Sequence, residues 1–106
     1  MPKYMFRASY TAAGAAGVLK EGGSARAKAV EAMVKSVGGT VECMYWAFGA
    51  DDFILIANAP DAGAAAAASL TVGASGGASV TTAELLTAKD IDKIVSRQVK
   101  YRAPGS

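Results

Sequence analysis

Residues 44–61, MYWAFGADDFILIANAPD, decide the fold that the sequence predicts. Two apolar runs of strand length flank a short Gly-Ala-Asp-Asp stretch, whose length and composition are typical of a hairpin loop. Aspartate favours such loops because its side chain bonds nearby backbone amides. We therefore expect two antiparallel strands, over 40–48 and 52–58, joined at Asp51 and Asp52, with Asp52 bonding backbone amides there.

The sequence on either side of this hairpin predicts two more strands and four helices. Alternating apolar residues with aromatic enrichment indicate strands, whereas apolar residues repeating every three or four positions indicate amphipathic helices. Glycine pairs and helix-capping residues mark the boundaries. The expected strands cover 3–10 and 78–86, and the expected helices cover 12–20, 24–37, 62–75 and 88–99, with N-caps at Thr11, Ser24, Asp61 and Thr87. In the last helix we expect Ile91, Ile94 and Val95 to face inward.

The order of these elements is a β-α-β unit repeated twice, with an additional helix in the first unit and another at the end. It predicts an α+β fold, a ferredoxin-like βαββαβ sandwich with extra helices. In this plan a four-stranded antiparallel sheet carries its helices on one face. The chain has 106 residues and is expected to form a single domain over residues 1–106.

The second face of this sheet is expected to be apolar. Strict alternation along the strands places Met44 and Trp46 on this face, together with Met5, Ile54 and Ile56. Soluble monomers rarely leave so large an apolar patch in water, and only 19% of the residues are charged. We therefore expect the chain to associate with itself through this face, as a dimeric α/β barrel-like assembly.

Charge and cysteine content argue against several classes of function. The net charge of +2 is too near neutral to indicate nucleic acid or an anionic membrane as a partner. The single cysteine, Cys43, has no partner for a disulfide within the chain, which favours a reducing, cytoplasmic location. No apolar run reaches the roughly 18 residues of a membrane span.

The chain contains no histidine, which removes the commonest general base near neutral pH and the usual ligand of zinc and haem. We therefore expect no metal and no cofactor, and we interpret Asp51 and Asp52 as a hairpin corner rather than a Mg²⁺ or Ca²⁺ site. Cys43 lacks a histidine to activate it, so a buried, inert thiol is the simpler interpretation.

The start of the second helix is a candidate site for an anion. Its residues are Gly22, Gly23, Ser24 and Arg26. The glycines expose backbone N–H groups beside a helix N-terminus, where phosphate and carboxylate groups bind favourably. A corner between two helices would need the same glycines, so both interpretations stay open.

Four segments carry a resemblance to a known family. PKYMFRASYTAAGAAGVLKEGGSARAKAVEAMVKSVGG, FGADDF, IANAPD and YRAPGS together resemble the GYD domain family, over nearly the whole chain. The resemblance implies a small bacterial protein of the ferredoxin-like, dimeric α/β barrel group, whose biochemical function is not established. The Gly-x-Tyr-Asp turn of the family reads Gly49-Ala50-Asp51-Asp52 here, so any chemical role of the tyrosine is lost.

Three functions follow as hypotheses. The first is a homo-oligomeric ferredoxin-like module that binds a small anionic or aromatic ligand. The second is a cofactor-independent oxygenase or isomerase acting on a small aromatic or quinone-like substrate, with candidate catalytic residues Arg7, Tyr10, Glu42 and Trp46. The third is a regulator that binds a phosphorylated metabolite at the glycine corner. Arg7 and Glu42 are also expected to pair across the sheet.

Overall fold

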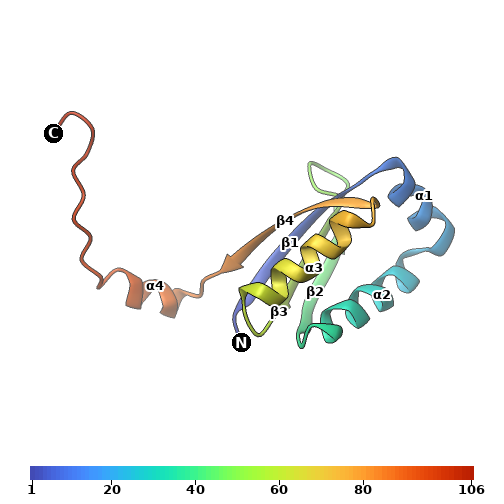
Figure 1. Cartoon of the computed structure of the whole chain (residues 1–106), viewed down its shortest axis with the longest axis horizontal. Coiled ribbons are helices and arrows are strands. Elements are labelled where there is room, and N and C mark those ends of the chain that lie inside the picture. Colours follow the sequence, from blue (N-terminus) through green and yellow to red (C-terminus); the bar gives the residue numbers. More distant parts are fainter.

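The computed structural model describes residues 1–106 and confirms the predicted order of strands and helices (Figure 1). The elements are β1 Lys3–Tyr10, α1 Ala12–Glu21, α2 Gly23–Ser36, β2 Thr40–Trp46, β3 Phe53–Asn58, α3 Ala62–Ala74, β4 Ala78–Leu85 and α4 Ala88–Ile94. None of the four helices has both the length and the apolar character that crossing a membrane requires.

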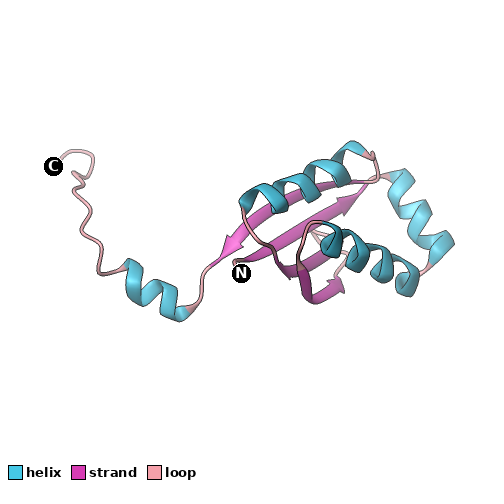
Figure 2. Ribbon diagram, turned by 60° about the horizontal axis from the view of Figure 1, so that its bottom comes forward, coloured by secondary structure: helices cyan, strands magenta, loops and turns pink.

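The four strands form one antiparallel sheet in the order β2-β3-β1-β4. Helix α2 contacts β2 and helix α3 contacts β4, so the two helices cover opposite sides of one face (Figure 2). Helix α1 lies at the end of the sheet, next to α2 (Figure 1). This α+β arrangement is consistent with the predicted ferredoxin-like fold.

The hydrophobic core lies between the sheet and the helices. Alternate residues of β1 and β3 supply its large side chains because successive strand residues point to opposite faces. The helices supply mainly small residues, and the core cluster consists of Tyr4, Phe6, Ala8, Val34, Phe53, Leu55, Ala57, Ala59, Ala65 and Ala78. Only 12 of the 106 residues are buried, so the core is small and many apolar side chains remain exposed.

Three of the four predicted N-caps are confirmed. Thr11, Asp61 and Thr87 each accept a hydrogen bond from the backbone N–H three residues later. Ser24 is not an N-cap, because α2 begins one residue earlier and no side chain caps it. The N-cap of α2 is Gly22, whose φ of 81° is a conformation that glycine adopts without strain.

A β-bulge in β2 changes which residues face the helices. Between Val41 and Cys43 the pairing with β3 shifts by one residue. The extra residue, Glu42, inverts the alternation along the rest of the strand. Met44 and Trp46 therefore face the helices and pack against the core. The prediction that they lie on the open face of the sheet is wrong.

The C-terminal helix does not pack against the sheet as predicted. Helix α4 ends at Ile94 instead of continuing to Val99, and none of its residues is buried. The prediction that Ile91, Ile94 and Val95 face inward is wrong, because these side chains are 45%, 38% and 73% exposed. Residues 86–106, which we call the C-terminal arm, extend away from the rest of the fold (Figures 1 and 2).

Candidate functional site

A cavity of about 310 Å³ lies between the sheet and helices α1, α2 and α3. Of the 27 residues that line it, 19 are hydrophobic. Small-molecule sites typically have volumes of roughly 300–1,000 Å³ and mainly apolar walls with a few polar groups. The cavity is therefore large enough for a small organic molecule and has the composition of such a site.

One wall of the cavity is aromatic. Tyr10 ends β1, Trp46 ends β2 and Phe53 begins β3, so the sheet brings the three rings to the same end. The ring centroids of Trp46 and Phe53 lie 4.9 Å apart in a tilted arrangement. This geometry gives a rigid apolar surface against which a flat ligand can pack.

The hydroxyl of Tyr10 is the most useful polar group in this wall. Trp46 Nε1 donates a hydrogen bond of 2.9 Å to Tyr10 Oη. The oxygen thus acts as an acceptor within the protein, and its own proton has no acceptor there. Tyr10 can therefore donate this proton to an oxygen or nitrogen atom of a ligand.

A charged pair stands in the lining where α1 meets α2. Arg26 Nη1 lies 3.4 Å from Glu21 Oε2, and both side chains are partly exposed. Arg26 lines the cavity, whereas the other three residues of the predicted anion site, Gly22, Gly23 and Ser24, lie exposed on the corner outside it. Anion binding at that corner stays a prediction.

The four candidate catalytic residues do not form one site. Tyr10 and Trp46 line the cavity on the helix side of the sheet. The strand pairing places Arg7 beside Ile54 on the open face, and Glu42 also reaches over that face. The sheet therefore separates the two pairs, and they cannot act together on one substrate.

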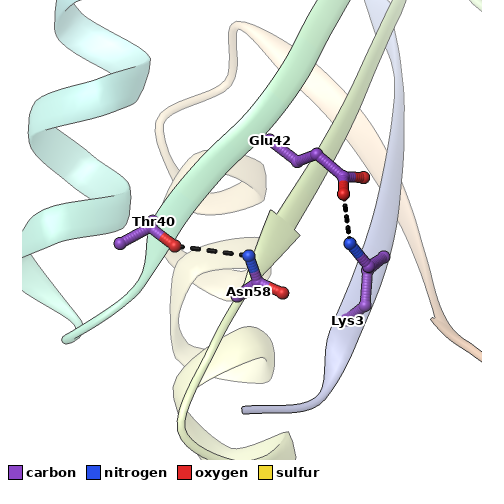
Figure 3. Close-up of polar contacts among 4 residues, drawn as sticks. All are labelled: Lys3, Thr40, Glu42 and Asn58. Atoms are coloured by element: carbon purple, nitrogen blue, oxygen red, sulfur yellow. Dashed lines mark hydrogen bonds and ion pairs between the residues drawn. The ribbon is translucent and has the colours of Figure 1, made fainter.

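Arg7 and Glu42 also do not pair with each other, contrary to the prediction. Figure 3 shows Glu42 of β2 reaching across β3 to form an ion pair with Lys3 of β1. Beside this pair, Asn58 Nδ2 donates a hydrogen bond of 3.3 Å to Thr40 Oγ1 (Figure 3). Arg7 instead lies 3.8 Å from the Asp51 carboxylate.

Between these two ion pairs the open face of the sheet is apolar. The strand pairing brings together five side chains that we call the open-face patch: Met5, Cys43, Tyr45, Ile54 and Ile56. Tyr45 is 68% exposed, and the other four are partly exposed. An apolar centre with a charged rim is the usual composition of a protein interface.

The acidic pair of the hairpin has a structural role. Asp52 Oδ2 accepts a hydrogen bond of 2.8 Å from the backbone N–H of Tyr10, which confirms that Asp52 bonds a backbone amide. That amide belongs to β1 rather than to the hairpin itself. Strand β2 ends two residues before Phe48, whose φ of 54° turns the chain. No group of three Cys, Asp or Glu side chains lies close enough together to hold a metal ion.

Two ionisable side chains have clearly shifted pKa values. Burial raises the pKa of Tyr4, and the neighbouring carboxylate of Glu84 raises it further. Hydrogen bonds from the backbone and side chain of Thr87 lower the pKa of Asp90. Neither Tyr4 nor Asp90 lines the cavity, so these shifts reflect packing and helix capping.

Sequence reasoning missed several residues of the cavity. Gly14 and Gly17 of α1, with Ala65 and Ala68 of α3, line it from the helix side. The signal was present as an unusual number of small residues in two helices that cover a sheet. Small side chains leave space between layers that larger ones would fill.

The model of the GYD domain family matches residues 4–95, which include all of the sheet except its first residue, the cavity and helix α4. Comparisons with curated proteins and with solved structures find no significant match. Because the family model covers most of the 106 residues, the chain belongs to the GYD domain family.

Proposed function

We propose that this GYD domain protein is a homo-oligomeric module that binds a small, mainly apolar molecule in the cavity between its sheet and its helices. The observation that carries the proposal is the aromatic wall with the free hydroxyl proton of Tyr10. An apolar cavity with one oriented polar group is the usual design of a small-molecule site.

The lining favours a particular class of ligand. The rings of Trp46 and Phe53 favour a flat aromatic body. The hydroxyl of Tyr10 favours a hydrogen-bond acceptor on that body, such as a carbonyl oxygen. An aromatic carbonyl compound, for example a quinone, combines both features. Arg26 can contact an anionic substituent of the ligand, and its partly exposed ion pair with Glu21 is then broken.

The open-face patch supports the oligomeric part of the proposal. Its apolar side chains are not covered by any element of the chain's own fold. Burying apolar surface is favourable by about 25 cal/mol per Å² before the cost of association is subtracted. A second copy that covers the patch would remove this apolar surface from water and produce a homodimer.

Fluorescence of Trp46 provides the test, because this is the single tryptophan of the chain and it lies in the cavity wall. Titration with menadione, a small naphthoquinone, is expected to quench the emission to saturation at one molecule per chain. Tyr10→Phe removes one hydrogen bond to the ligand and is expected to weaken the affinity by about fivefold to tenfold. Tyr45→Phe makes the same change on the open face and should leave the affinity unchanged.

A cavity-filling variant completes the design. Val30 lines the cavity from α2, so Val30→Phe is expected to abolish saturable quenching while the fold, measured by circular dichroism, persists. Non-saturable quenching of the unmodified protein, or equal affinities for the Tyr10→Phe and Tyr45→Phe variants, would contradict ligand binding at this wall. The mass of the protein in solution is measured separately, so failure of association is distinguished from failure of binding.

A further inference from the structure

Helix α4 presents an apolar stripe that has no partner in its own chain. Ile91, Ile94 and Val95 lie three and four positions apart, so they share one side of the helix, and all three are exposed. Val99 and Tyr101 continue the exposed apolar surface along the C-terminal arm, at 83% and 76% exposure. The arm therefore offers a second unpaired apolar surface, in addition to the open-face patch.

Helix α4 is too short to persist in water without packing. It has seven residues, whereas isolated helices shorter than about 12–15 residues are marginal even with good helix-forming sequences. Its capping box between Thr87 and Asp90 fixes the start of the helix but supplies no buried apolar area. The helical conformation of α4 therefore implies a surface against which its apolar stripe packs.

The connection between β4 and α4 directs the arm away from the chain's own sheet. Only Leu86 and Thr87 separate the two elements, and Thr87 has an extended backbone with φ −79° and ψ 167°. Figure 1 shows α4 beyond the end of β4, clear of the sheet. Folding back over the same sheet would require a reversal within this connector, and short connectors of this kind favour exchange between copies.

A second copy of the chain provides a surface that matches the arm. The open-face patch is apolar at its centre and is uncovered on every copy. A helix of seven residues is about 10 Å long, and with the extended tail it can cross a sheet whose strands are about 4.8 Å apart. The arm also falls within the roughly 20 to 30 residues per side that a stable interface uses.

We propose that the C-terminal arm of each copy packs on the open-face patch of a second copy, in a two-fold exchanged dimer. The apolar stripe of α4 then covers the centre of the patch on the other copy. Because each copy contributes one arm and one patch, both apolar surfaces of both copies are buried. The match of the GYD domain extends to residue 95, so α4 belongs to the family's domain. The proposal deepens the self-association in the proposed function by naming the element that performs it, and it is independent of ligand binding.

Three variants of the full chain test the exchange. The arm variant carries Ile91→Ser, Ile94→Ser and Val95→Ser. The patch variant carries Ile54→Thr and Ile56→Thr, which keep β-branched side chains in the strand. The control variant carries Leu19→Ser and Leu70→Ser, which change exposed apolar side chains on α1 and α3, outside the arm and the patch. Circular dichroism checks that each variant folds, and Tyr45→Thr replaces the patch variant if the latter unfolds.

Sedimentation velocity at micromolar concentrations measures the association. The unmodified protein and the control variant are expected to be dimers. The arm variant and the patch variant are each expected to dimerise about 100-fold more weakly, because several apolar contacts are lost. A dimer of the arm variant as tight as that of the unmodified protein would overturn the proposal, as would an unmodified protein that is monomeric.

Mixing the two weakened variants gives the decisive result. A mixed dimer contains one intact arm on one intact patch, whereas neither variant alone can form such a contact. We therefore expect the mixture to dimerise at concentrations at which each variant alone is monomeric. Failure of the mixture to dimerise would overturn the proposal that the two copies exchange their C-terminal arms. Small-angle scattering would show a compact monomer if the arm instead folded onto its own sheet, which would also overturn it.

Discussion

The first test of the packing around the cavity compares Gly14→Ala with Gly17→Ala in helix α1. A Cβ atom at Gly14 would lie 1.9 Å from the carbonyl oxygen of Gly77, in the loop between α3 and β4. A Cβ atom at Gly17, one turn later, would meet no atom within 4 Å. The two substitutions make the same chemical change in the same helix but in opposite steric surroundings.

The structure sets the size of the expected difference. Thr11 holds α1 against this loop, because its backbone N–H donates to Gly77 at 3.0 Å and its hydroxyl donates to Gly76 at 2.8 Å. To make room for a methyl group at Gly14, α1 must move about 1.5 Å away from the glycine loop. This movement breaks both hydrogen bonds, which costs about 1 kcal/mol each, and the remaining overpacking costs about 1–2 kcal/mol more. The helix preference of alanine offsets about 1 kcal/mol.

We therefore expect Gly14→Ala to lower the free energy of unfolding by about 2–3 kcal/mol and the Tm by about 10–15 °C. Gly17→Ala is expected to raise the free energy of unfolding by about 0.5–1 kcal/mol. Urea unfolding followed by Trp46 fluorescence, at one fixed protein concentration, measures both values. Shifts of the same sign and size would refute the close contact between α1 and the glycine loop, and with it the described wall of the cavity.

Two further predictions concern the hairpin and the arm. Asp52→Ala leaves the backbone N–H of Tyr10 without its acceptor and should reduce the free energy of unfolding by about 1–2 kcal/mol. Asp51→Ala removes only a partly exposed ion pair with Arg7 and should change the free energy of unfolding by less than about 0.5 kcal/mol. The pKa of Asp90 is lowered because its ionised carboxylate accepts the capping hydrogen bonds. These bonds therefore stabilise α4 fully at pH values above the ordinary carboxyl pKa, and they are lost as the pH falls through the lowered pKa of Asp90 in the folded protein. NMR chemical shifts of residues 88–94 should therefore lose helical character below about pH 4, and an unchanged profile in Asp90→Asn would contradict the capping role.

The parts of the fold that depend on local chemistry could be predicted from the sequence. Thr11, Asp61 and Thr87 act as N-caps because their side chains reach the backbone only three residues away. Ser24 failed as a cap for an equally local reason. Gly22 already adopts the positive φ that ends α1, and α2 then starts at once.

The bulge in β2 could not be predicted, because it depends on the pairing between strands. Val41, Met44 and Trp46 end on the same face only when one extra residue is inserted opposite β3. The sequence of β2 is apolar at both odd and even positions, so its alternation does not reveal the inversion. The polar Glu42 is the residue that the bulge accommodates, and it reaches Lys3 across an intervening strand.

The position of α4 was mispredicted because periodicity identifies an apolar side of a helix but not the molecule that covers it. Ile91, Ile94 and Val95 have the spacing of a core-facing stripe. The four-stranded sheet already carries α2 and α3 on its helix side, and the connector of two residues leads away from that side. The same spacing is therefore compatible with burial in another copy.

The bulge connects the cavity to the interface. Trp46 would lie on the open face if β2 alternated without interruption, and the cavity would lose the hydrogen bond that orients Tyr10. Tyr45 would then point toward the helices instead of standing exposed on the open-face patch. One inserted residue thus supplies both the aromatic wall on one face and the aromatic centre of the proposed interface on the other.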